Sequence, residues 1–218
     1  MKGSIEYIKE AWGIYFKKEN FIFFARIMAI VVIISSAIGY LFSYLYPTTN
    51  WQDFKFENTQ MMVVFVILSL ASIIIGLWTQ AVRYFALFRM GSTEKEIFKL
   101  GYKNILRLFL ISLTLGLIVF FGAILLIIPA VIFGIWYSFS TFLVLDKEMS
   151  IKEALRTSKL MVKGRFFKVL GRYFVFSLFF IFISIILSLI PYVGNLAVSF
   201  MAPLFILPHY LLYRDLSI

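Results

Sequence analysis

Residues 125–172 read LLIIPAVIFGIWYSFSTFLVLDKEMSIKEALRTSKLMVKGRFFKVLGR, and this stretch indicates how the whole chain is organised. An apolar run ends at Asp146, an amphipathic segment follows at residues 150–164, and a basic sequence then leads into another apolar run. This order is typical of a membrane span, a surface helix and a second span. Ser150 and Glu153 have the spacing of a capping box, and Gly164 is suited to the left-handed position that ends a helix.

The composition extends this interpretation to the whole chain. Of the 218 residues, 62% are hydrophobic and 15% are charged, and the mean hydropathy is +0.94. Soluble domains carry roughly 25% charged residues, so this chain lacks the polar surface that water requires. Its length suits about six spans of ~20 residues. We therefore predict an all-α polytopic membrane protein with a single membrane domain over residues 1–218.

Six spans in three hairpins are expected, at about residues 21–46, 61–85, 104–126, 130–145, 166–190 and 195–213. The apolar stretch that holds the third and fourth spans is too long for one helix. A tight turn is expected in it between Gly122 and Pro129, because proline interrupts a helix. Residues 191–194 form the turn before the sixth span, and Pro203 and Pro208 are expected to kink that span.

A short amphipathic cytoplasmic helix is expected before each odd-numbered span, at residues 1–20, within residues 89–103 and at residues 150–164. The first has an apolar face suited to the membrane interface, formed by Ile5, Ile8, Trp12, Tyr15 and Phe16. The second begins at the capping pair Thr93 and Glu96. Each of the three segments ends in a basic sequence, and the closing residue is small or carries an amide: Asn20, Asn104 and Gly164. This shared ending indicates a weak internal repeat.

The placement of charge predicts the orientation. The net charge is +10, and of the 21 Lys and Arg residues only Lys55 lies on the side of the first loop. The others lie on the side of both termini and of the linkers that follow the even-numbered spans. The positive-inside rule then places the N- and C-termini in the cytoplasm, and we expect the protein in the cell membrane.

The basic residues near the third surface helix lie at the ends of spans, where the cytoplasmic leaflet carries anionic lipid. They are candidate contacts for anionic head groups: Lys152, Arg156, Lys159, Lys163, Arg165 and Lys168. This placement favours membrane lipids over nucleic acid as the partner of a basic chain. A protein partner stays open, and the sequence predicts no oligomeric state.

Catalytic and metal-binding motifs are not found. The chain has no cysteine and one histidine, His209, so thiolate chemistry, cysteine metal sites and two-histidine metal motifs are excluded. His209 is expected to be structural, bonded to a carbonyl or to lipid. No Asp or Glu lies inside a predicted span, which counts against proton-coupled transport. We predict no catalytic residue, no metal and no cofactor.

The stretch quoted first resembles the integral-membrane domain fused to some bacterial glycerophosphoryl diester phosphodiesterases and its stand-alone relatives of unknown function. The residues that carry the resemblance are Pro129, Asp146, Ser150, Glu153, Ala154, Ser158 and Gly164. The ending LYRDL at residues 212–216 is similar to the Tyr-x-Asp-Leu ending of that group. The resemblance implies a six-span bundle with an amphipathic helix between spans four and five. The phosphodiesterase chemistry of the fused enzymes belongs to a separate soluble domain, which is not expected within these 218 residues.

These features lead to two functional hypotheses. The first is a non-enzymatic integral membrane protein that organises or modulates lipids, or a partner protein, at the cytoplasmic leaflet. The alternative is a small transporter or channel for an unidentified solute. An intramembrane enzyme is the least favoured class, because the sequence contains no catalytic motif and His209, which has serines available to it, is expected to be structural.

Overall fold

The computed structural model describes residues 1–46, 59–190 and 193–217. Every regular element in these residues is an α-helix, which confirms the all-α prediction. Six stretches of them are long and apolar enough to cross a membrane, as expected for a multi-pass membrane protein. The first loop was predicted at residues 47–60; residues 47–58 lie outside the described residues, and Thr59 and Gln60 already belong to a helix. The start of the predicted turn, residues 191–192, also lies outside the described residues.

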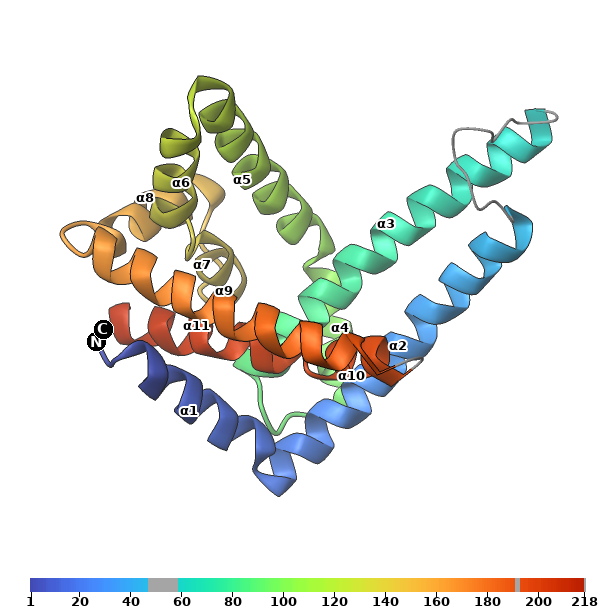
Figure 1. The fold of residues 1–218 in the computed structure, drawn as a ribbon. Coiled ribbons are helices and arrows are strands. Elements are labelled where there is room, and N and C mark those ends of the chain that lie inside the picture. Colours follow the sequence, from blue (N-terminus) through green and yellow to red (C-terminus); the bar gives the residue numbers. More distant parts are fainter. Residues whose placement is uncertain (47–58, 191–192, 218) are drawn as a thin grey trace.

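Three hairpins provide the spans (Figure 1). They are formed by α2 (Lys18–Leu45) with α3 (Thr59–Phe88), by α5 (Ile105–Leu125) with α6 (Ile127–Trp136), and by α9 (Phe166–Ser188) with α10 (Val193–Phe200) and α11 (Ala202–Leu216). The remaining helices are α1 (Ser4–Phe16), α4 (Glu94–Lys103), α7 (Ser140–Asp146) and α8 (Ile151–Val162). Figure 1 shows the α2–α3 and α5–α6 hairpins diverging from a common base, in which α1, α9 and α11 lie.

The core lies in this base, and aromatic side chains dominate it. Phe142 stacks on Tyr213 with ring centroids 5.2 Å apart, and Tyr15 stacks on Phe24 at 5.3 Å. The arms, in contrast, are open: none of the most apolar part of α3 is buried inside the protein. Since such surface cannot face water, acyl chains must cover the arms.

The second hairpin turns within a single residue, Leu126, which separates α5 from α6. A Cβ at Gly122 would lie 3.0 Å from the Ala130 Cα, so only glycine allows the two helices to approach this closely. Pro129 is the third residue of α6, where the missing N–H removes no helical hydrogen bond. The turn thus lies within the predicted 122–129 segment.

Two predicted spans are not continuous helices. The fourth was expected at residues 130–145, but α6 starts at Ile127 and ends at Trp136, and α7 begins only at Ser140. The sixth was expected at residues 195–213, but it is divided at Met201 into α10 and α11. Pro203 is the second residue of α11, so the division at Met201 lies in the turn before this proline, where a proline interrupts a helix.

The N-terminal helix differs from the prediction in the face that it presents. Its predicted membrane face included Tyr15, but this side chain is buried, as are Tyr7 and Ala11. The reason is tertiary: α1 packs against α2, α9 and α11. The apolar side chains of α1 that face outward are Ile5, Trp12 and Phe16. The helix therefore carries two apolar faces, one toward the bundle and one toward lipid.

The three surface helices end before their spans by comparable devices. The Asn20 side-chain amide donates to the Ile14 carbonyl at 2.8 Å, and the Asn104 amide donates to the Leu100 carbonyl at 3.0 Å. In the third case Gly164 takes a left-handed φ of +75°. The surface helices are also shorter than expected, since α1 ends at Phe16 and not at residue 20, and α8 covers Ile151–Val162 and not 150–164. The two asparagine amides satisfy backbone carbonyls at the ends of their helices, and the glycine changes the direction of the backbone. In each case the surface helix is separated from the span that follows.

Candidate functional site

Helix α8 begins and ends with local signals. The Ser150 hydroxyl accepts a hydrogen bond from the Glu153 backbone N–H at 3.4 Å, and the Glu153 carboxylate lies in the first turn, where the helix dipole favours a negative charge. One face buries Ala154, Ser158 and Val162. The opposite face is exposed and basic, and it carries Lys152, Arg156, Lys159 and Lys163.

Ser158 connects α8 to the break in the fourth span. Its hydroxyl donates to the Trp136 carbonyl at 2.8 Å and accepts from the Phe139 backbone N–H at 3.1 Å. Both backbone groups lie at the ends of α6 and α7, where no helical partner is available to them. A single buried side chain therefore satisfies the backbone polar groups that the interruption frees, and fixes α8 against the span.

Asp146 is the last residue of α7, and its Oδ2 accepts a hydrogen bond from the Tyr213 hydroxyl at 3.1 Å. The sequence pattern predicts that Asp146 and Glu148 lie in a loop, either solvated or salt-bridged, whereas in the structure Asp146 ends α7 and joins it to α11. Glu148 forms an ion pair with Arg107 at 3.6 Å. The motif residues around α8 therefore act as caps and cross-links between helices.

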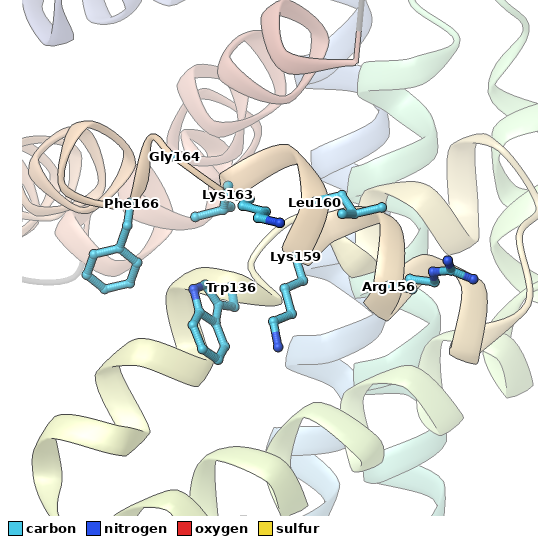
Figure 2. A pocket seen from close by; sticks show the side chains of 8 residues that line it. Trp136, Arg156, Lys159, Leu160, Lys163, Gly164 and Phe166 are labelled. Atoms are coloured by element: carbon cyan, nitrogen blue, oxygen red, sulfur yellow. The ribbon is translucent and has the colours of Figure 1, made fainter.

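A groove of about 400 Å³ lies along α8, and we name it the basic groove. Its lining comes from α6, α8 and the start of α9 and consists of Trp136, Arg156, Lys159, Leu160, Val162, Lys163, Gly164 and Phe166. Figure 2 shows the Trp136 ring beside the extended Lys159 side chain, with Phe166 on the far side of the ring. The Lys159 Nζ lies 4.2 Å from the centroid of the Trp136 ring, a cation–π contact.

The predicted head-group contacts divide into two sites. Arg156, Lys159 and Lys163 line the basic groove. Arg165 and Lys168 instead line a second pocket of about 400 Å³ together with Met1 and Arg172. Lys152 is exposed and lines neither site. The sequence placed these cations on one surface because they are close along the chain, but the turn at Gly164 directs the two groups apart.

Arg172 shapes the second pocket by holding the N-terminal segment. Its guanidinium donates to the Lys2 carbonyl through Nη2 at 2.6 Å and Nε at 3.0 Å, and to the Lys168 carbonyl through Nη1 at 2.7 Å. With three of its donors used in this way, Arg172 acts mainly as an anchor. This pocket is therefore less suited to a ligand than the basic groove.

His209 lies inside α11, and its Nδ1 is 3.2 Å from the Phe205 carbonyl one turn earlier. Because a carbonyl only accepts, Nδ1 is the donor. The imidazole packs edge-on against Tyr173 and Phe176, with centroids at 4.5 and 5.2 Å. This is the structural role that the sequence predicted. Across residues 1–46, 59–190 and 193–217, no three acidic or histidine side chains gather as a metal site.

Sequence reasoning missed the aromatic part of the basic groove. Trp136 and Phe166 lie 30 positions apart and belong to different spans, so only packing brings them together. Trp136 lies in the middle of the apolar stretch Ile127–Asp146, so its position in the sequence offered no sign of an interfacial role. Arg172 was also not identified, because its role depends on contact with the N-terminus.

The helices and their apolar surface define the class of this protein, a multi-pass, all-α integral membrane protein. Comparisons with family models, with curated proteins and with solved structures gave no match. The assignment of a particular role therefore depends on the residues of the groove and on their chemistry.

Proposed function

We propose that the protein binds anionic lipid head groups at the cytoplasmic leaflet of the cell membrane, without enzymatic activity, and that the basic groove is the binding site. The observation that carries this proposal is the composition of the groove: three cations, Arg156, Lys159 and Lys163, share one hollow with apolar side chains. The phosphate group of a phospholipid can contact the cations while the acyl chains of the same lipid lie against Leu160 and Phe166. A free anion would use only the first of these contacts.

The chemistry favours phospholipid over nucleic acid as the partner. Cations on the cytoplasmic side gain up to roughly 1 kcal/mol each from anionic lipid. Three such contacts correspond to at most about a 100-fold preference for anionic over zwitterionic lipid. Since Lys159 already contacts Trp136, the preference is expected to be lower than this. Lipid binding at a defined groove is a basis for organising lipids or a partner protein around the bundle.

The proposal includes an orientation with both termini in the cytoplasm, which the bias of Lys and Arg supports. It also includes a relationship to the membrane domain of the glycerophosphoryl diester phosphodiesterases. The sequence motif around α8 suggests that relationship, and two of its residues, Asp146 and Ser158, form hydrogen bonds that fix α7 and α8.

Competitive lipid enrichment tests the proposal. The detergent-solubilised protein is delipidated, exposed to equal amounts of phosphatidylglycerol and phosphatidylcholine, repurified, and its bound lipid is quantified. We expect the wild type to retain an excess of phosphatidylglycerol and the triple variant R156Q/K159Q/K163Q to lose most of it. The matched control is K95Q/K99Q, which neutralises two exposed lysines of α4 outside the groove. Equal enrichment in wild type and triple variant would refute the proposal.

The same preparation addresses the alternative, a small transporter or channel. Vesicles that contain the reconstituted protein are loaded with a panel of ions and small metabolites. The release of these solutes is compared with their release from equally loaded vesicles without protein. Release above the protein-free control that persists in R156Q/K159Q/K163Q would favour transport over lipid binding as the primary function.

A further inference from the structure

A charged side chain lies inside the first hairpin, away from the basic groove. Arg83 belongs to α3, five residues before the helix ends at Phe88, or about 8 Å along the axis. It is half-buried, and its Nε is shielded from solvent without a hydrogen-bond partner. An arginine inside a span is costly unless another group pairs with it, and such residues usually mark a functional site.

Arg83 lines a pocket of about 190 Å³ between α2, α3 and α10. The other lining residues are Val31, Val32, Ser35, Ser36, Leu196 and Ser199. The pocket therefore combines one guanidinium with three hydroxyl groups, and both kinds of group can donate hydrogen bonds to an anion. Val31, Val32 and Leu196 supply an apolar wall that strengthens any charge interaction in the pocket.

No carboxylate of the lining helices can neutralise Arg83. Neither α3 nor α10 contains Asp or Glu, and α2 contains only Glu19. Glu19 forms an ion pair with Lys17 at 3.2 Å, and it lies 12 positions before Val31, about 18 Å along the helix. On α4, which packs against α3, Glu94 pairs with Arg26 at 3.5 Å.

The comparison with Arg26 shows what is unusual. Both arginines lie in the first hairpin, but Arg26 is exposed and has an acidic partner on α4. Arg83 points into a hollow that contains donors and no acceptor with a negative charge. A guanidinium offers several N–H donors in a planar fork that matches the oxygens of a phosphate or a carboxylate.

We propose that the pocket around Arg83 is a second, intramembrane binding site for a phosphate-type oxyanion, held by the guanidinium and by the hydroxyls of Ser35 and Ser36. The site is separate from the basic groove, because no residue lines both. The anion can come from a phospholipid head group or from phosphate in solution. Ser35 and Ser36 are exposed on the outside of α2, so the pocket is open toward lipid.

Thermal unfolding of the full chain in neutral detergent tests the site with two probes, inorganic phosphate and short-chain phosphatidylglycerol. Chloride at matched ionic strength is the reference for both. A ligand that binds only the folded state raises the unfolding temperature, and the shift grows with the logarithm of its concentration above the dissociation constant. We expect at least one probe to raise it for wild type and for R156Q/K159Q/K163Q, in which the basic groove is neutralised. Retention in that triple variant distinguishes this site from the proposed function.

The variant R83Q is expected to weaken binding of that probe at least about 10-fold, a loss of about 1.4 kcal/mol. R89Q, which removes an exposed arginine six positions further along, is the matched control and should bind as wild type. Because R83Q could alter folding, S35A/S36A provides a second test that keeps the guanidinium, and weaker binding is again expected. A response to phosphate assigns a free anion, and a response to the lipid alone assigns a head group. No shift with either probe, or wild-type affinity in R83Q or S35A/S36A, would overturn the proposal.

Discussion

Tyr7 and Asp215 lie 208 positions apart in the sequence and are joined by a hydrogen bond of 2.6 Å from the tyrosine hydroxyl to Oδ2 of the carboxylate. At the other end of α1, the Tyr15 hydroxyl donates to the Phe200 carbonyl at 2.8 Å. The first bond joins α1 to the C-terminal end of α11 and the second joins it to the last residue of α10, so together they hold α1 against α11. The N-terminal helix is therefore a part of the bundle, and its outer face alone is left for lipid.

The first prediction concerns this connection. Tyr7→Phe is expected to lower the free energy of unfolding by about 2 kcal/mol, because it removes a hydrogen bond to a charged group. Thermal unfolding in detergent measures the change. Tyr102→Phe is the control, since Tyr102 is 75% exposed on α4 and its loss should have little effect. Equal stability of Tyr7→Phe and wild type would mean that apolar contacts alone hold α1.

The second prediction concerns alkaline pH. Burial, and for Tyr7 also the bond to Asp215, raises the pKa of Tyr7 and of Tyr15 to about 12. Both side chains are thus more easily ionised in the unfolded chain, where the tyrosine pKa is about 10. Their contribution to stability is fully present below pH 10 and is lost as the pH rises through about 12.

Thermal unfolding is measured between pH 10 and 12 for the wild type and for the double variant Tyr7→Phe/Tyr15→Phe. We expect the stability of the wild type to decrease more over this range than that of the variant. A spectroscopic titration of tyrosinate should also show two fewer late-ionising groups in that variant. Parallel stability curves for the two proteins over this range would contradict the assignment.

The third prediction concerns the interruption of the fourth span. Ser158→Ala leaves the Phe139 N–H and the Trp136 carbonyl without their partner, and an unsatisfied buried group costs about 1–3 kcal/mol. We expect a loss of stability in that range and a change in tryptophan fluorescence as Trp136 moves. Ser177→Ala, at an exposed position of α9, is the control. If the two variants were equally stable, Ser158 would not support the break.

The fourth prediction compares two glycines. Gly164 has a φ of +75°, so Gly164→Ala should destabilise the protein by about 1 kcal/mol or more through backbone strain. Gly13 lies inside α1 with open space around it, so Gly13→Ala should stabilise by about 0.5–1 kcal/mol. Unfolding midpoints that shift in opposite directions would agree with this expectation. A Gly164→Ala variant as stable as wild type or more stable would show that this position does not require a left-handed conformation.

The fifth prediction concerns orientation. The chain contains no cysteine, so single cysteines can report sidedness without background. In right-side-out membranes, a membrane-impermeant maleimide should label Thr49→Cys without treatment and Lys152→Cys only after permeabilisation. The opposite pattern would invert the proposed orientation, and labelling of both positions in intact membranes would contradict the hairpin topology.

The ends of the surface helices were predictable from the sequence because they depend on neighbours. Ser150 with Glu153 and Thr93 with Glu96 cap helices within one turn, and the structure contains both contacts. The backbone at Gly164 is likewise a local matter. The groove was only partly predictable: Arg156, Lys159 and Lys163 share a face of one helix, whereas Trp136 reaches them from another span.

The sequence by itself determined the class of the protein and the presence of six apolar spans, because hydropathy is a property of each segment alone. Only the tertiary structure decided that Ser158 completes a broken span, that α1 packs along α11, and that Arg83 enters a pocket without a carboxylate. These features depend on which side chains meet across large distances in the chain. Apolar residues are too similar to one another for their pattern to specify such contacts, because lipid and bundle interior attract them almost equally.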